Sequence, residues 1–127
     1  MARLITNEAL ADRFPSVRGK ARVDARTKKL ALRILPGEIA VINHLDLDLP
    51  CAQALLARKV AAVVNAQAYI SGRYPSLGPG LLLQAGVILL EGVGPEIMTA
   101  LAEGEELEII GEAVFAGGKI IGRGTRL

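Results

Sequence analysis

Short unbroken apolar runs alternate along the chain with segments of helical spacing, which is the pattern of an α/β domain. The runs at residues 38–43, 60–64 and 87–90 are typical of strands that are buried on both faces of a parallel sheet. Residues 19–25 instead alternate polar and apolar side chains, which predicts a half-exposed strand ahead of them. We therefore expect a central, partly parallel sheet.

Helices are predicted between these strands. Thr27 suits a helix N-cap before residues 28–35, and Asp48 suits one before a helix that carries Pro50 in its first turn and runs to about residue 58. A third helix is expected over residues 79–85, closed by Gly86, and a fourth over residues 96–102. The predicted fold is a single α/β domain with flanking helices.

The C-terminal part alternates at residues 106–110 and 112–115, and Gly117-Gly118 predicts a two-residue hairpin turn into a last strand. Residues 1–17 have weak periodicity and are expected to form a leading arm, so the predicted domain spans residues 18–127. Because the sequence stops directly after a strand, we expect it to be a fragment of a longer protein.

Composition narrows the function classes. Apolar residues make up 51% of 127 residues and only four are aromatic, so the core must be aliphatic. One cysteine excludes an internal disulfide, and we expect a cytoplasmic protein without a secretory signal or membrane segment. The net charge is +2, with the basic residues concentrated before residue 34. Without interleaved aromatic residues this segment does not predict nucleic-acid binding.

The most informative stretch is the polar, glycine-rich segment 65–80, which follows a predicted parallel strand. Loops at this end of a strand are where α/β sheets place ligands. Each candidate ligand-binding residue offers a flexible backbone, a hydroxyl or amide group, a charge, or a ring that can stack. The candidates are Asn65, Ser71, Gly72, Arg73, Tyr74 and Ser76. Backbone N–H groups near the serines suit an oxyanion, and the guanidinium suits phosphate or carboxylate. The alternative is a structural loop whose polar groups only cap the sheet.

Two further groups extend this hypothesis. Arg22 and Arg26 could join Arg73 in an anion pocket, or form ordinary surface ion pairs. His44, Asp46 and Asp48 alternate, so in an extended segment they could ligate a divalent metal, with His44 and Asp46 as the candidates once Asp48 caps the helix; Asp46 could cap as well, and no metal or other cofactor is assigned. Cys51, with one histidine in the chain, is expected to be a small buried thiol. No P-loop or dinucleotide fingerprint occurs, so no catalytic residue is assigned.

The order of elements over residues 36–115 resembles the swivelling β/β/α domain, the mobile phosphohistidine domain of enzymes that use phosphoenolpyruvate. In that family a Ser-His pair precedes a helix. The matching positions here are Ser76 and Leu77, so the resemblance implies the fold without the phosphotransfer.

A second resemblance covers nearly the whole chain from Gly19 onward. Residues 21–28, 36–48, 63–66 and 70–79, the last containing Ser-Gly-Arg-Tyr-Pro, resemble the N-terminal half of the SteA-like proteins. These bacterial, thiamin pyrophosphokinase-related proteins are linked to the cytokinetic ring and cell division. The resemblance implies a cytoplasmic domain that precedes a pyrophosphokinase-like domain. Together with the chemistry of the Ser-Gly-Arg-Tyr loop, it leads us to expect a non-catalytic module that binds an anionic small molecule or partner at that loop.

Two alternatives remain open. The domain could close over the nucleotide or thiamin-type substrate of that neighbouring domain, or the loop could form a homo-oligomeric contact.

Overall fold

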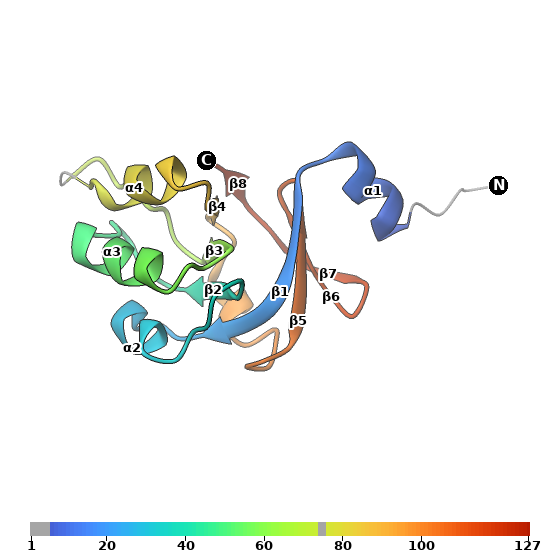
Figure 1. Ribbon diagram of the computed structural model, residues 1–127. Helices are drawn as coiled ribbons and strands as arrows, with labels where there is room; N and C mark the ends of the chain where they lie inside the picture. Colours follow the sequence, from blue (N-terminus) through green and yellow to red (C-terminus); the bar gives the residue numbers. More distant parts are fainter. Residues whose placement is uncertain (1–5, 74–75) are drawn as a thin grey trace.

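The computed structural model describes residues 6–73 and 76–127, which form an α/β domain around one eight-stranded mixed sheet. The strand order is β7-β6-β5-β1-β2-β3-β4-β8, as Figure 1 shows in part. The four central strands run parallel: β1 (Ser16–Val23), β2 (Ile39–Ile42), β3 (Ala62–Asn65) and β4 (Ile88–Glu91). The parallel core predicted from the unbroken apolar runs is thus confirmed.

Antiparallel strands extend this core on both sides. They are β5 (Glu106–Ile110), β6 (Ala113–Ala116), β7 (Lys119–Arg123) and β8 (Thr125–Arg126). The first three continue from β1, whereas β8 pairs with β4 at the other end of the strand order. The predicted hairpin is confirmed, with both turn glycines at positive φ.

Three helices cover one face of the parallel strands, and a fourth lies by β5 (Figure 1). The covering helices are α2 (Thr27–Ala31), α3 (Leu49–Ala57) and α4 (Gly78–Gln84), and α1 (Asn7–Arg13) is the fourth. Pro95–Met98 forms only a single 3-10 turn, η1, so the helix predicted over residues 96–102 is wrong. Among the described residues, no helix is long and apolar enough to cross a membrane.

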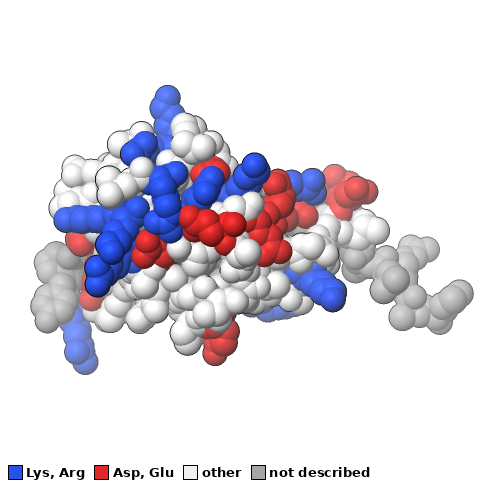
Figure 2. All heavy atoms as spheres, turned by 90° about the horizontal axis from the view of Figure 1, so that it is seen from below, with Lys and Arg blue, Asp and Glu red and all other residues white. Residues whose placement is uncertain are grey.

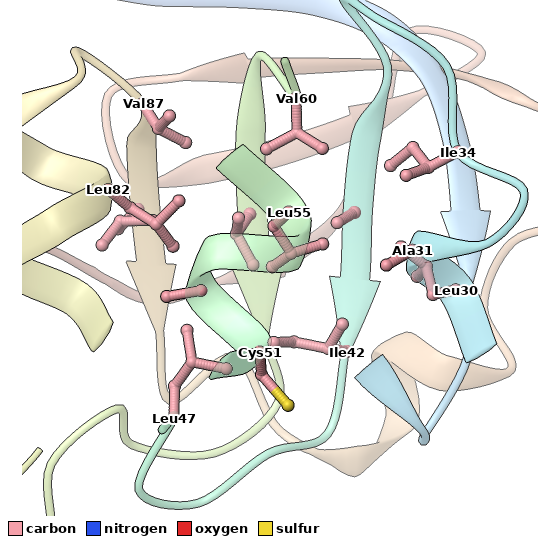
Figure 3. Close-up of a cluster of buried hydrophobic side chains, with 14 of the residues drawn as sticks. Leu30, Ala31, Ile34, Ile42, Leu47, Cys51, Leu55, Val60, Leu82 and Val87 are labelled. Carbon is pink, nitrogen blue, oxygen red and sulfur yellow. The ribbon is translucent and has the colours of Figure 1, made fainter. Parts of the chain in front are cut away.

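Alternate residues of the parallel strands feed two separate apolar cores. On the helix side, Ile42 belongs to one apolar cluster that includes residues of all three covering helices, among them Leu30, Leu55 and Leu82 (Figure 3). On the opposite face, residues of β1–β4 pack with β5, β6 and η1, where Ile97 is buried. Because the sheet is covered on both faces here, β2, β3 and β4 carry almost no polar side chains.

The last two strands connect the two ends of the strand order. A single residue, Gly124, separates β7 from β8, so the chain passes directly from the β6 side of the sheet to the edge of β4. A Cβ atom on Gly124 would collide with the backbone oxygen of Glu91 and lie 2.8 Å from Val93 Cγ2. Glycine therefore allows the close approach on which this connection depends.

The segment expected to be a leading arm contains regular structure. Residues 7–13 form α1, whose N-cap Thr6 accepts a hydrogen bond from the backbone of Ala9, and β1 begins at Ser16 rather than Gly19. The first residues of β1 pair with β5. This pairing joins distant parts of the sequence and leaves no local periodic signal.

Candidate functional site

The carboxyl ends of β1, β2 and β3 meet at one edge of the sheet, and the loops that leave them carry the polar residues of interest. Residues 24–26 lead from β1 into α2, residues 43–48 lead from β2 into α3, and residues 66–77 follow β3. This is the edge where open α/β sheets place ligands.

A groove of about 410 Å³ lies between the first two of these loops. Its lining consists of Ala25, Arg26, Thr27, Lys28, Lys29, Asn43, His44, Leu45 and Cys51. Three of these residues are cationic and none is acidic. Figure 2, viewed from the side on which α2 lies in Figure 1, shows lysine and arginine side chains gathered on this face beside acidic ones.

The basic residues of the groove carry exposed charge. Arg26, Lys28 and Lys29 are all exposed, and no ion pair within 4 Å involves them among the described residues. Asp24 lies near Lys29 and Asp48 near Lys28, but neither carboxylate is within 4 Å of these ammonium groups, so the exposed cations can still attract an anion into the groove.

The turn that presents Arg26 is held by Asp24. Its carboxylate accepts a hydrogen bond from the backbone nitrogen of Arg26 at 2.9 Å, and Arg33 donates to its other oxygen at 2.9 Å. These two donors hold the pKa of Asp24 below its ordinary value. Arg33 also bonds Glu103 and the carbonyl of Val23, which ties the segment just after α2 to the end of β1.

Thr27 has a different role from the one predicted. The helix begins with Arg26 as an N-cap that makes no side-chain cap bond, and the Thr27 hydroxyl instead lies 2.7 Å from His44 Nδ1. Thr27 is buried, with 3% of its surface exposed. The contact joins the loop after β1 to the loop after β2 across the floor of the groove.

Asn65, predicted to contact ligand, is fully buried and bonded to the backbone. Its side-chain oxygen accepts from the backbone nitrogens of His44 and Gln67, and its amide nitrogen donates to the carbonyl of His44 at 2.8 Å. Ligand binding by Asn65 is therefore not supported. The residue fixes the position of the His44 backbone instead.

The oxyanion cradle expected at Ser71 exists, but this chain fills it. The Asp46 carboxylate accepts from the backbone nitrogen of Ser71 at 2.6 Å and from its hydroxyl at 2.7 Å. Asp46 adopts a left-handed φ of 57°, so His44 and Asp46 are not arranged as in an extended strand. The extended geometry on which this metal alternative depended is therefore absent.

The other residues of this loop are mostly structural. The Ser76 hydroxyl donates to the carbonyl of Leu47 at 2.8 Å, so it is not free to cradle an anion. Gly72 adopts a φ of 86°, and the backbone nitrogen of Arg73 donates to the Ser71 hydroxyl, while its side chain is exposed. Tyr74 lies outside the described residues. Residues 70–73 and 76 line neither the groove nor the smaller hollow beside it, which Ala66 and Gln67 at the start of this loop help to line.

Arg22 likewise forms an ion pair within the chain, with Glu38. Its guanidinium binds Glu38 through two bonds of 3.0 and 3.1 Å, and Glu103 lies 3.9 Å away. Arg22 holds the pKa of Glu38 below its ordinary value, assisted by the backbone nitrogen of Leu35. The surface ion pair, one of the two alternatives for Arg22, describes the structure; of the two arginines proposed as helpers, only Arg26 lines the groove.

Cys51 and Asp48 lie beside His44 at the start of α3. Asp48 caps the helix as predicted, accepting from the backbone nitrogen of Cys51 at 2.8 Å. Burial, with the neighbouring Asp48 carboxylate, raises the pKa of the Cys51 thiol to about 11. The thiol is therefore a poor nucleophile, in agreement with its expected role as a small buried residue.

Asn43 joins the groove to a second hollow of about 290 Å³, lined by Asn43, Ala66, Gln67 and Pro95. The Oδ1 atom of Asn43 is buried and has no hydrogen-bond partner among the described residues. Buried polar atoms are almost always paired, so this position suits a donor from a water or a ligand.

A larger hollow of about 780 Å³ lies beside α1 and is lined by Glu8, Glu106, Glu108 and Arg18. Glu108 there accepts from Asn7 at 3.3 Å and from Arg18 at 3.1 Å. Because its lining is acidic, this hollow does not suit an anion and is a weaker candidate than the groove at the sheet edge.

Asn43 and the contact between Thr27 and His44 were not predicted from the sequence as parts of a binding groove. The rule that ligands bind at the carboxyl ends of parallel strands was applied to the strand at 60–64 and its loop, although Asn43-His44 follows the preceding predicted strand in the same way. In comparisons with known proteins, no family model and no curated protein matches this chain.

Proposed function

We propose that this domain is a non-catalytic module that binds a small anionic molecule in the groove between the β1–α2 turn and the loop after β2. The observation that carries the proposal is the lining of that groove, where Arg26, Lys28 and Lys29 meet without an acidic residue. A phosphate or pyrophosphate group suits three exposed cations at the edge of a sheet.

Asn43 adds a second recognition element. Its buried Oδ1, which has no partner among the described residues, can only accept hydrogen bonds. A ligand that carries a hydroxyl or amino group beside its anionic group can therefore bind both Asn43 and the cations. A phosphorylated small molecule, such as a nucleotide, combines these features. Inorganic phosphate satisfies only the cations.

The biological context remains a prediction from resemblance. The parallel core, covering helices and terminal hairpin support the swivelling β/β/α architecture, and residues 70–76 carry most of the likeness to the SteA-like proteins. On that reading this chain is the anion-binding half of a bacterial protein involved in cell division. The anion site proposed here differs from the expected one, because Asp46 fills the cradle at Ser71.

Calorimetric titration of the full chain with pyrophosphate and with nucleoside diphosphates, in the presence of a metal chelator, tests the proposal. Replacing Lys28 or Arg26 with Gln should weaken pyrophosphate binding about two- to fivefold each, since exposed charges contribute up to about 1 kcal/mol. Raising the ionic strength should weaken it further. Lys119→Gln, which removes an exposed charge from the terminal hairpin, is the matched control and should bind normally.

Two results would contradict this function. One is the absence of heat and of any rise in melting temperature with every phosphorylated probe. The other is equal weakening by Lys28→Gln and Lys119→Gln, because this would indicate attraction by net charge rather than binding in the groove.

A further inference from the structure

Beside the groove, at the start of α3, lie three side chains that are well suited to a transition metal. His44, Asp48 and Cys51 each offer one ligand atom, and these three atoms all lie within 4.8 Å of one another. The His44 Nε2 atom is 3.8 Å from Asp48 Oδ2. Nitrogen, oxygen and sulfur ligands together are the set that Zn²⁺ accepts, with metal–ligand distances of about 2.0–2.3 Å.

This spacing is close to what coordination requires. Tetrahedral bonds of these lengths place ligand atoms roughly 3.3–3.8 Å apart. The ligand atoms of the cluster therefore need to approach one another by about an ångström at most. All three residues come from one short segment, and Asp48 and Cys51 share the first turn of α3.

The backbone of this segment is already fixed. Asn65 binds both the backbone nitrogen and the carbonyl of His44, and the side chain of Asp48 is bonded to the first turn of α3. Ligands that are held in place before the metal arrives lose little conformational freedom on binding. This arrangement favours a site that forms in the folded protein.

Thr27 supplies the contact that a metal-binding histidine requires. Metal-ligating imidazoles almost always donate their second ring N–H to a fixed acceptor, which sets the tautomer and the ring orientation. Here the Thr27 hydroxyl lies 2.7 Å from His44 Nδ1, and it comes from the buried start of α2. With the proton on Nδ1, the lone pair of Nε2 faces Asp48.

We infer that His44, Asp48 and Cys51 form a zinc site with three protein ligands, whose fourth position opens into the groove. His44 and Cys51 both line that groove, so a water molecule or an oxygen of an anion can complete the tetrahedron. When the metal binds, the Cys51 thiol releases its proton to solvent and the thiolate takes its place on the ion. The metal site stands independently of the proposed anion binding.

Charge around the cluster is consistent with this assignment. The Asp48 carboxylate and the Cys51 thiolate together balance a divalent ion. Lys28 lies close enough to lower the pKa of both groups, which opposes the effect of burial on the thiol. The cations of the groove then attract an anionic fourth ligand to the metal, so an ion here would strengthen anion capture.

Cobalt spectroscopy tests the site with little ambiguity, because the chain contains one cysteine and one histidine. We expect one equivalent of Co²⁺, added to reduced, metal-free, untagged full chain, to give a thiolate-to-cobalt charge-transfer band and the strong visible bands of tetrahedral cobalt. Zn²⁺ should abolish both sets of bands and raise the melting temperature. A chain that shows no thiolate band with Co²⁺ and no stabilisation by Zn²⁺ would overturn the proposal.

Variants separate the three ligands from their neighbours. Cys51→Ser should remove the charge-transfer band, and His44→Gln should weaken Co²⁺ binding more than tenfold. Asp48→Asn keeps a good helix cap but loses the charged ligand, so it should weaken binding, whereas Asp46→Asn in the same loop should not. Equal effects of the two aspartate variants would contradict the ligand set.

The role of Thr27 is tested by Thr27→Val, which has nearly the same shape. It should lower metal affinity about 10–100-fold while the charge-transfer band of the saturated protein remains. Unchanged affinity would exclude Thr27 as a positioning residue. Sizing with and without Co²⁺ completes the test, since a site that forms only in a metal-bridged dimer would contradict three ligands from one chain.

Discussion

The carboxylate of Asp46 accepts two hydrogen bonds from Ser71, 2.6 Å from its backbone nitrogen and 2.7 Å from its hydroxyl. Ser71 thus has the anion-binding geometry that its glycine-rich surroundings predict, and the bound anion is part of the same chain. The two residues are 25 positions apart, and their contact ties the loop after β3 to the loop after β2.

Asp46→Ala should therefore release Ser71. We expect the variant to lose about 1 kcal/mol of stability, since the bonds are exposed, and to gain weak affinity for phosphate at the vacated position. Thermal unfolding with and without phosphate measures both effects. A double-mutant cycle with Ser71→Ala provides the control, because the second substitution should cost little once Asp46 is absent.

Asn65→Ala should strongly lower the free energy of unfolding, because this one side chain bonds three backbone groups. It leaves two backbone N–H groups and the carbonyl of His44 without their partner beside a fully buried side chain, at a cost of roughly 2–4 kcal/mol. Asn65→Asp retains the acceptor for both N–H groups and loses only the donor. Urea unfolding should rank the alanine variant as the less stable, and equal stability of wild type and Asn65→Ala would show that the contact is unimportant.

Two glycine substitutions should have opposite effects. Gly124→Ala places a Cβ atom against the backbone oxygen of Glu91 and should cost about 1–3 kcal/mol. Gly80, within α4, has open space around its would-be Cβ, so Gly80→Ala should raise stability by about 0.5–1 kcal/mol. Denaturant midpoints of the two variants, measured under one condition, test the pair. A harmless Gly124→Ala would refute the close approach of β7–β8 to β4.

Acid should destabilise the domain partly through Glu38. Arg22 lowers the pKa of Glu38 in the folded state below its ordinary value of 4.5, so unfolding at low pH is accompanied by proton uptake. The contribution is present above about pH 4.5 and is lost as the pH falls through the folded pKa. The melting temperature of Glu38→Gln, followed from pH 7 to about pH 3, should fall less steeply than that of the wild type. Parallel curves would contradict the pairing.

Local patterns predicted the interior of this fold and not its connections. The apolar runs that became β2 and β3 are unbroken because both faces of those strands are buried, and this signal is contained within each run. The two-residue strand β8 has no such pattern, and its pairing with β4 is set by contacts between residues 34 and 36 positions apart in sequence. The single turn of η1 was overestimated because Gly94-Pro95 resembles a full helix start.

The site was predicted only at the level of the sheet edge. Arg26 could be named as a candidate from the basic segment, but whether a charge is free or paired depends on neighbours that sequence alone does not place. Arg22 and Arg26 look alike in the sequence, yet Glu38 takes only the former. Thr27 shows the same limit. Its hydroxyl could cap a helix or bond a histidine that is distant in sequence, and the sequence does not distinguish the two.

The pairing of β8 with β4 has a consequence for solubility. An uncovered β4 would present an apolar strand with free backbone donors and acceptors, which is a template for pairing with a second molecule. The antiparallel contacts of Leu90 with Arg126 and of Glu91 with Thr125 occupy that edge with the chain's own backbone. The terminal strand thus protects the sheet against aggregation by edge-to-edge strand addition.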